Sequence, residues 1–296
     1  MQPQEINIIS KDGIKIPAFI YNYNNNNSDN NASEPAKPKG IVIIIHGFGE
    51  HAGGYREAAE RLAQANYISV VFDQRGHGNM PQYSTKQRKK YFGVIPSYQS
   101  FLEDIDAAAA ELKRQNPGIP VVIYAHSMGG NIAADYLLTR SQSDFSCAVL
   151  ESPWFGLYRE VNPFMSAAAS VLGRLLPNTA IVTKLPPCDV TGDKTKSGEM
   201  EKDPLYHNRI SFGMFDGINK ACKYILNNAS KLSVPIFLAY AKNEKIVSNP
   251  AIQKFYGSCG DNVKIKEYES SHAIHNDAKR EDFYNDMIAF IDEHCK

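Results

Sequence analysis

Five short apolar runs without alternation are the feature that most limits how this chain can fold. β-Branched residues dominate the first three, and the five runs cover 41–45, 68–72, 121–124, 147–150 and 235–240. A strand that faces water on one side alternates apolar and polar residues, whereas a strand covered on both sides is apolar throughout. The runs therefore predict buried strands of a parallel sheet with helices on each side.

The segments between these runs show helical periodicity. Apolar residues recur on one helix face within 97–115, 132–137 and 284–291, and the first pattern ends at Asn116-Pro117-Gly118. Alternating strands and helices favour an α/β fold with right-handed crossovers. Near the N-terminus, apolar and polar residues alternate on both sides of Asp12-Gly13, which predicts an antiparallel hairpin.

Two segments depart from this alternation. Six prolines occur between residues 153 and 208, together with one amphipathic helical pattern at 164–176. We interpret 153–208 as a helical cap, or lid, inserted into a core formed by 1–152 and 209–296. Seven of the ten residues from 22 to 31 are asparagine. Such low-complexity polar sequence predicts a flexible Asn-rich surface loop over 22–39.

Charge and cysteine spacing exclude several classes of protein. Thirty-two basic residues balance thirty-two acidic ones, so no general positive field exists to hold nucleic acid. The five cysteines form no CxxC pair, which argues against a zinc site or a disulfide framework and favours a reduced, cytoplasmic setting. No run approaches the roughly 20 apolar residues of a membrane span, and Met1–Gly13 lacks the apolar stretch of a signal peptide.

Ser127 lies in a small-x-Ser-x-small pattern that follows the run at 121–124 and precedes a helical pattern. A serine at a sharp strand-to-helix turn is the nucleophile elbow of serine hydrolases, and small residues flank it because the turn brings backbone segments close together. Here Ala125 and Gly129 are those small residues. The alternative is a tight turn with a buried serine, and we predict the nucleophile.

An attacking serine needs a histidine as base and an acid that orients the histidine. In this kind of fold the chain order is serine, acid, histidine. Glu244 follows the run at 235–240, and His272 follows a further strand pattern at 263–268. Both therefore lie past the carboxyl ends of strands, where the sites of open α/β sheets form. His275 is the alternative base, and we expect it at the surface or in support of the site.

Two other loops follow predicted strands. The first is glycine-rich, so that the backbone N–H of Phe48, together with that of Met128 after the serine, can stabilise a developing oxyanion. The alternative is an ordinary turn. The second loop contains Asp73, Arg75 and His77, which precede the serine and fall outside the expected order. We expect Asp73 and Arg75 to hold loops beneath the site.

Four motifs together resemble the monoacylglycerol lipase and lysophospholipase-like branch of the α/β-hydrolases. They are His46-Gly47-x-Gly49-Glu50-His51, Asp73-x-Arg75-Gly76-His77-Gly78, His126-Ser127-Met128-Gly129-Gly130 and Asp203-Pro204-Leu205. The resemblance runs from about Ile6 and implies an eight-stranded, mostly parallel sheet flanked by helices, a helical cap, and esterase chemistry without metal or organic cofactor. Ala125 stands where this branch usually has glycine, and Glu244 stands where it typically has aspartate.

These features predict a serine hydrolase of carboxylic esters that acts on monoacylglycerol- or lysophospholipid-like substrates, or on other short-to-medium acyl esters. Ser127 would form an acyl-enzyme, His272 would transfer the proton, and Glu244 would orient His272. The apolar cap helix can line an acyl pocket or make transient contact with a membrane surface. Two alternatives remain open, namely a peptidase or amidase with the same triad and a non-catalytic homologue that binds a ligand.

Overall fold

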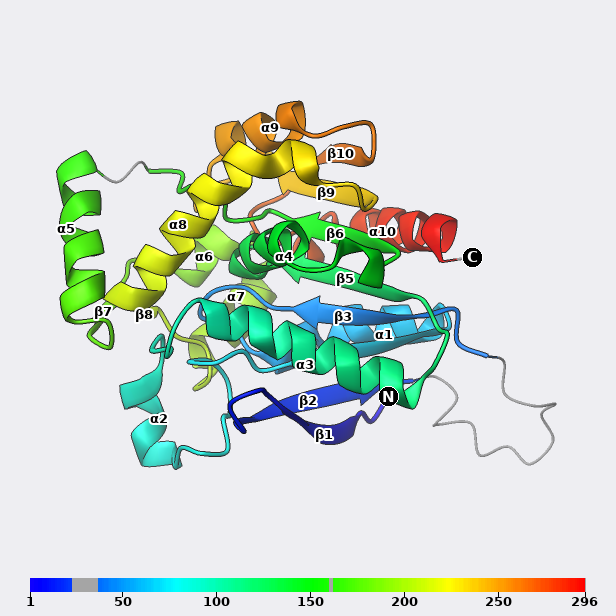
Figure 1. Ribbon diagram of the computed structural model, residues 1–296, viewed down its shortest axis with the longest axis horizontal. Coiled ribbons are helices and arrows are strands. Elements are labelled where there is room, and N and C mark those ends of the chain that lie inside the picture. The colour runs from blue at the N-terminus through cyan, green and yellow to red at the C-terminus, as the bar shows by residue number, and fades with distance from the viewer. Residues whose placement is uncertain (23–36, 160–161, 296) are drawn as a thin grey trace.

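An eight-stranded sheet forms the centre of the computed structural model, which describes residues 1–22, 37–159 and 162–295 (Figure 1). The strand order is β1-β2-β4-β3-β5-β6-β9-β10. The strands are β1 (Gln4–Ile9), β2 (Lys15–Tyr21), β3 (Gly40–Ile45), β4 (Tyr67–Phe72), β5 (Val121–His126), β6 (Cys147–Glu151), β9 (Ile236–Ala241) and β10 (Val263–Tyr268). The pairs β1–β2 and β2–β4 are antiparallel, and the other five pairs of this sheet are parallel. The predicted fold, a mostly parallel eight-stranded sheet, is confirmed.

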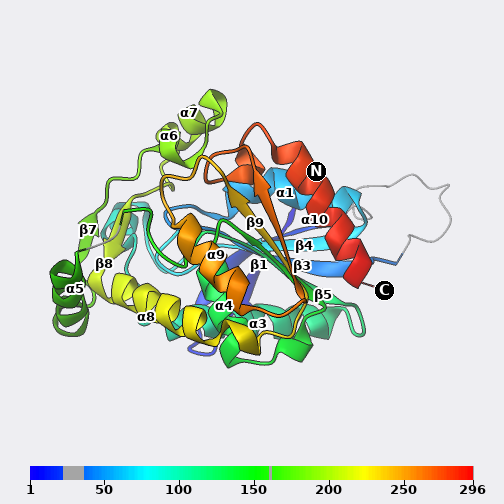
Figure 2. The ribbon, with the colours of Figure 1, turned by 90° about the horizontal axis from the view of Figure 1, so that it is seen from above.

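Helices cover both faces of this sheet, as Figure 2 shows. One layer contains α3 (Gln99–Gln115), α4 (Met128–Thr139), α8 (Phe212–Asn228) and α9 (Asn249–Ser258), and the other contains α1 (Arg56–Gln64) and α10 (Arg280–His294). Along β3, Ile41, Ile43 and Ile45 pack on the first layer, whereas Val42 and Ile44 pack on the second. Each such side chain contributes about 1.5–3 kcal/mol when fully buried, which explains why these strands are apolar without alternation.

The N-terminal hairpin and the loop after β4 are joined by buried charges. β1 and β2 pair in antiparallel register around the turn at Asp12-Gly13, as predicted. The Arg75 guanidinium binds the carboxylates of Asp104 on α3, at 2.6 Å, and of Asp12, at 2.5 Å. Asp73 accepts hydrogen bonds from two backbone N–H groups of neighbouring loops. Both residues therefore hold loops, as expected. The loop predicted at 22–39 lies largely outside the described residues.

The segment between β6 and α8 contains short helices and two short strands that lie outside the central sheet. It contains α5 (Pro163–Leu175), β7 (Ala180–Val182), α6 (Pro187–Val190), α7 (Lys194–Lys202) and β8 (Arg209–Ser211), while α2 (Thr85–Tyr91) follows β4. β7 pairs with β8, so the pairing crosses the expected boundary at 208. Two contacts connect the insertion to the loop after β3: His51 Nε2 lies 2.7 Å from Asp203 Oδ2, and the His207 N–H donates to Gly49 O at 2.9 Å.

Candidate active site

Ser127 occupies a strained turn between β5 and α4. Its backbone has φ +54° and ψ −115°, a conformation that residues other than glycine rarely adopt and that functional sites often contain. The turn brings α4 against β3, because a Cβ added to Gly129 would lie 2.2 Å from the carbonyl oxygen of Ile45. Ala125 is fully buried. The local sequence thus forms a sharp strand-to-helix turn with Ser127 between β5 and α4.

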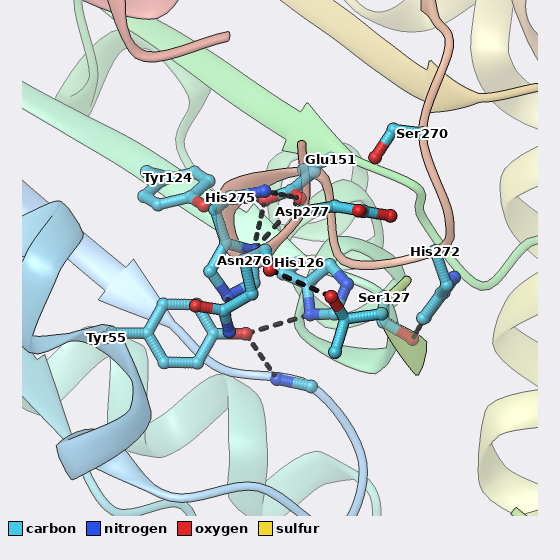
Figure 3. Close-up of polar contacts among 12 residues, drawn as sticks. Tyr55, Tyr124, His126, Ser127, Glu151, Ser270, His272, His275, Asn276 and Asp277 are labelled. Atoms are coloured by element: carbon cyan, nitrogen blue, oxygen red, sulfur yellow. Dashed lines mark hydrogen bonds and ion pairs between the residues drawn. The ribbon is translucent and has the colours of Figure 1, made fainter. Parts of the chain in front are cut away.

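The structure brings Ser127, His272 and Glu244 together from three loops (Figure 3 shows the first two). Ser127 Oγ lies 2.9 Å from His272 Nε2, and His272 Nδ1 lies 2.7 Å from Glu244 Oε2. The other oxygen of Glu244 accepts the backbone N–H groups of the three residues that follow it, Lys245, Ile246 and Val247. The carboxylate is therefore fixed at both oxygens, and it can orient the imidazole toward the serine.

The electrostatic interaction between Glu244 and His272 favours the ionised form of Glu244. Burial opposes ionisation of Glu244, but the charge of His272 and its hydrogen bond outweigh it and lower the pKa of the carboxyl. Burial likewise disfavours the His272 imidazolium, but Glu244 outweighs this effect and raises the pKa of His272 above its ordinary value. His272 is thus a stronger base than an isolated buried histidine, as transfer of a proton from a serine requires.

The two predicted oxyanion donors are Phe48, in the loop after β3, and Met128, which directly follows Ser127. Met128 begins α4, where a backbone N–H has no partner inside the helix. Within the described residues, no protein acceptor takes the N–H of Phe48 or of Met128. The Gly47 N–H donates a hydrogen bond of 2.7 Å to Glu50 Oε2, which stabilises the loop that carries Phe48. Both N–H groups are therefore free to bind a substrate oxygen.

A second set of buried polar groups lies next to His272, whose ring centroid is 4.8 Å from that of His126, and the sequence patterns did not reveal most of this set. The Tyr55 hydroxyl donates to Glu50 at 2.5 Å and lies 2.8 Å from His126 Nδ1 (Figure 3). His275 Nδ1 lies 3.0 Å from each carboxylate oxygen of Glu151. His275 is therefore buried and does not lie at the surface. An acid at the end of an apolar strand was the one sequence signal for Glu151.

One group of three side chains in this cluster could hold a metal ion. In the part of the chain that the structure describes, ligand atoms of His126, Glu151 and His275 lie within 4.8 Å of one another, and His126 Nε2 has no hydrogen-bond partner. However, His275 and both oxygens of Glu151 already bind each other, and Tyr124 donates to Glu151 at 2.6 Å. Hydrogen bonding alone thus accounts for the carboxylate and for His275.

A cavity of about 1030 Å³ extends from Ser127 and His272 toward the cap. Its walls are mainly apolar, and the cap and the adjoining strand contribute Ala168, Ala169, Leu172, Ile181, Leu185 and Ile210. Phe48 and Trp154 line it next to the serine, with their rings packed edge to face at 6.2 Å. An apolar cavity with a few polar groups at one end is typical of a site for a small apolar ligand.

Three buried histidines lie together under the loop that carries Phe48. The ring centroids of His46 and His77 are 5.3 Å apart, and those of His77 and His207 are 4.8 Å apart. Burial is the main cause that lowers the pKa of His46 to about 3, of His77 to about 4 and of His207 to about 2. All three rings are therefore neutral in the folded protein near neutral pH.

We expect the free energy of unfolding to fall as the pH drops from 6.5 toward 5. The unfolded chain protonates these histidines near pH 6.5, the ordinary value, whereas the folded protein does not, so acid favours the unfolded chain. Their contribution is complete above the unfolded pKa, and each histidine costs up to about 1.4 kcal/mol per pH unit below it. Urea unfolding across this pH range measures the loss.

The variant His207→Gln provides the control. In the folded protein His207 Nε2 lies 3.1 Å from the carbonyl oxygen of Gly76, a contact that a glutamine amide can replace. The variant should lose about one third of the part of the pH dependence that these histidines cause, because one of the three neutral rings is removed. Other groups also titrate in this range; for example, burial raises the pKa of Asp135 to about 6. Their contributions are the same in the parent and the variant, so the difference between the two proteins reports His207. An equally steep dependence in the variant would contradict the assignment.

No helix in the described part of the chain is long and apolar enough to cross a membrane. The cap does expose several apolar side chains, namely Tyr158, Val171, Leu175, Leu176, Ile181 and Val182. Two of these side chains, Tyr158 and Ile181, also line the cavity.

Comparisons with known proteins agree with this geometry. Residues 36–279 match the Hydrolase_4 family, described as serine aminopeptidase, S33. The chain is 28% identical to human monoglyceride lipase over 251 residues, which cover 81% of this chain and 77% of that protein. It is also 30% identical over 260 residues to an uncharacterized abhydrolase domain-containing protein from Dictyostelium discoideum; these residues cover 87% of this chain and 27% of that protein's length.

The fold has close counterparts among solved structures. A soluble variant of monoglyceride lipase from Saccharomyces cerevisiae, in complex with a substrate analog, superposes with a TM-score of 0.83 and 22% identity, covering 99% of this chain and 96% of the other. Because the two sequences are only 22% identical, this similarity supports a shared fold and not a shared substrate. Because the family match covers most of the chain and the folds agree, this chain belongs to the Hydrolase_4 family of α/β-hydrolases and is similar to monoacylglycerol lipases.

Proposed function

We propose that this protein hydrolyses carboxylic esters of lipids that carry a single acyl chain. The observation that carries the proposal is a continuous hydrogen-bonded chain from Ser127 through His272 to Glu244 at one end of an apolar cavity. Monoglyceride lipase among the relatives supports the same class of substrate. The cavity would hold the acyl chain, and Ser127 would meet the ester carbonyl.

The reaction follows from the positions of these groups. Ser127 Oγ attacks the ester carbonyl as His272 Nε2 takes its proton, and the N–H groups of Phe48 and Met128 stabilise the oxyanion. His272 then donates the proton to the departing alcohol, which leaves an acyl-enzyme on Ser127. Water, deprotonated by His272, releases the fatty acid and restores the serine. Glu244 stays ionised and stabilises the imidazolium in both halves of the reaction.

The wall of the cavity supports two kinds of head group. Three basic side chains, Arg159, Lys184 and Lys245, line it. Lys245 lies 3.7 Å from Asp189, whereas within the described residues no ion pair involves the other two. A glycerol head needs only hydrogen bonds, but two unpaired cations can also bind the phosphate of a lysophospholipid. We therefore propose lysophospholipids beside monoacylglycerols as substrates.

The cap would deliver such lipids from a membrane surface. Val171, Leu175, Leu176 and Val182 are exposed apolar side chains on α5 and the strand beyond it, and the cavity opens among their neighbours. Exposed apolar patches of this kind mark interaction sites. We therefore propose that residues 153–208 bind the lipid surface, whereas the core formed by 1–152 and 209–296 carries out the hydrolysis. A cytoplasmic setting remains our proposal from the cysteine spacing.

Amide hydrolysis is the nearest alternative, since the family is described as serine aminopeptidase. An aminopeptidase needs an unpaired carboxylate to bind the substrate's α-amino group. The two acids that line the cavity are engaged: Glu50 binds Tyr55 and the Gly47 N–H, and Asp189 lies near Lys245. The cavity therefore favours esters. A purely ligand-binding role is disfavoured, because it would not need aligned triad atoms.

The test measures p-nitrophenyl esters from acetate to laurate alongside an aminopeptidase substrate. Each methylene that enters the cavity should raise kcat/KM roughly fourfold, because its burial yields about 0.8 kcal/mol. Esters should be cleaved and the peptide substrate should not. Faster cleavage of the peptide substrate, or rates that ignore chain length, would contradict the proposal. Monoacylglycerol and lysophosphatidate with the same acyl chain then distinguish the two head groups.

Two neighbouring residues on α5 provide matched variants. Leu172 lines the cavity, whereas Val171 is 55% exposed and does not. Leu172→Asp should abolish the preference for laurate and leave acetate unaffected. Val171→Asp should leave both soluble esters unaffected and weaken binding to lipid vesicles. Equal effects of the two variants on chain-length preference would argue against an acyl chain in this cavity.

A further inference from the structure

Glu151 is a fully buried acid that neither belongs to the proposed triad nor lines the cavity. It ends β6, the strand that pairs with β5 before Ser127. A buried carboxylate is costly unless it is paired and hydrogen-bonded. Burial raises its pKa, but the charges of His275 and His126 outweigh this effect and lower the pKa of Glu151 to about 2. The Glu151 carboxylate therefore stays negatively charged, and His275 and Tyr124 both bind it.

The main chain and the side chain of Glu151 hold two different parts of the site. Its carbonyl oxygen accepts the N–H of Ser127 at 2.9 Å, which fixes the nucleophile turn. Its carboxylate accepts the N–H of His275 at 3.0 Å and lies 3.0 Å from the ring Nδ1 of that histidine (Figure 3). One residue therefore links the turn that carries the serine to the loop that carries the histidines.

The loop after β10 carries both His272 and His275, and Glu151 fixes it from the core side. The loop is also held by the Ala273 N–H, which donates to Val190 of the cap at 2.8 Å, and by Asp277, which accepts the Ser271 N–H at 2.6 Å. The bonds from His275 to Glu151 attach this loop to the central sheet through buried groups. Their position three residues after His272 limits where that imidazole can lie.

Glu151 also acts on His272 through charge. Burial is the largest influence on His272 and lowers its pKa; Glu244 opposes it most strongly, and the more distant Glu50 and Glu151 add to the effect of Glu244. The charged or titratable groups that face this pair of histidines are Glu244, Glu50, Glu151, His126, Tyr55 and Lys196. Removal of one of the three carboxylates should therefore make His272 a weaker base.

We propose that Glu151 is a positioning residue for the reaction, since it fixes the Ser127 turn through its carbonyl and the His272 loop through its carboxylate. The inference rests on the proposed ester hydrolysis. It predicts that Glu151 determines the alignment of serine and base and leaves substrate binding unaffected, because Glu151 makes no contact with the cavity.

The test is Glu151→Gln, assayed with a p-nitrophenyl ester over a range of pH. The kcat should fall about 10- to 100-fold, because a small misalignment of the reacting groups has that effect. KM should be unchanged. The acid limb of kcat/KM, which reports protonation of His272 in the free enzyme, should move to lower pH by roughly half a unit as the charge is lost.

Two further variants separate positioning from general stability. Tyr124→Phe removes the other side-chain hydrogen bond to Glu151 and leaves its contacts with His275, so it should retain kcat and the acid limb even if it lowers the Tm. Glu151→Asp keeps the charge but shortens the side chain, so kcat should fall while the acid limb stays. It also serves as the main variant if Glu151→Gln does not fold.

The outcomes distinguish this inference from the proposed function. If the parent protein hydrolyses no ester, the proposed function fails. If the parent is active and Glu151→Gln keeps both its kcat and its acid limb, Glu151 has no positioning role. If Tyr124→Phe loses as much kcat as Glu151→Gln, the effect belongs to packing of the buried cluster and the inference is overturned.

Discussion

Replacement of Ser127 by alanine should abolish ester hydrolysis. Among the residues that the structure describes, only the Ser127 hydroxyl is hydrogen-bonded to His272 Nε2, so we expect the variant to have no nucleophile that this base can activate. Loss of such a serine lowers kcat by at least about 10⁴-fold, and the residual rate comes from the oxyanion donors and from binding. A fluorophosphonate probe should label the parent protein and fail to label the variant, and a p-nitrophenyl ester assay should give the same ranking.

The fold should survive this substitution. Alanine can adopt the same backbone as serine at φ +54°, and the side chain loses a single hydrogen bond to His272. We therefore expect the Tm to change by only a few degrees, since removal of one hydrogen bond costs about 1 kcal/mol. Hydrolysis or labelling retained by a purified, folded variant would refute the assignment of Ser127 as the nucleophile.

His272→Ala should lower kcat more than Glu244→Gln, and both effects should be large. Without the imidazole no group takes the serine proton, and the expected loss is about 10⁶-fold. Glu244→Gln should cost about 10⁴-fold because it stabilises the wrong tautomer. Three backbone N–H groups hold the oxygen Oε1 of Glu244 as an acceptor. The oxygen of the glutamine would take that place, and its NH₂ group would then face His272 Nδ1.

In that arrangement Nδ1 must accept a hydrogen bond, so the proton lies on Nε2 and the ring cannot take one from Ser127. Single-turnover rates with a p-nitrophenyl ester measure both losses, and circular dichroism with thermal melting confirms that the variants fold. If Glu244→Gln retained full activity, the carboxylate would not orient His272 and the acid of the triad would have to be sought elsewhere. If Glu244→Gln lowered kcat more than His272→Ala does, the predicted order of the two effects would be wrong.

The sequence indicated the sheet because the strand signal is local. The apolar run at 41–45 shows by itself that both faces of β3 are covered, and the hairpin signal at Asp12-Gly13 is equally short-range. Helices α1, α8 and α9 were not predicted. The glycines at 213 and 217 weaken the helical signal of α8, yet they are where it comes close to its neighbours, since a Cβ at Gly217 would lie 2.6 Å from the Tyr98 side chain.

The sequence also singled out Ser127, Glu244 and His272, because each follows a predicted strand and their order is the one that this kind of fold requires. It gave little indication of the buried cluster behind them. Tyr55 and His126 are 71 residues apart, and Glu151 and His275 are 124 apart. Apart from the position of Glu151 at the end of an apolar strand, the sequence near these residues does not distinguish a buried partner from an ordinary polar side chain.

Local patterns therefore determined the fold class and the order of the proposed catalytic groups, because hydrophobic periodicity and turn-forming residues can be identified from neighbouring positions in the sequence. Only the tertiary structure decided that Glu151 meets His275 and how large the apolar cavity is. It also decided that Glu151 holds both the serine turn and the histidine loop. These features depend on distances between residues far apart in the chain, and those distances are set when the strands pair and the helices pack.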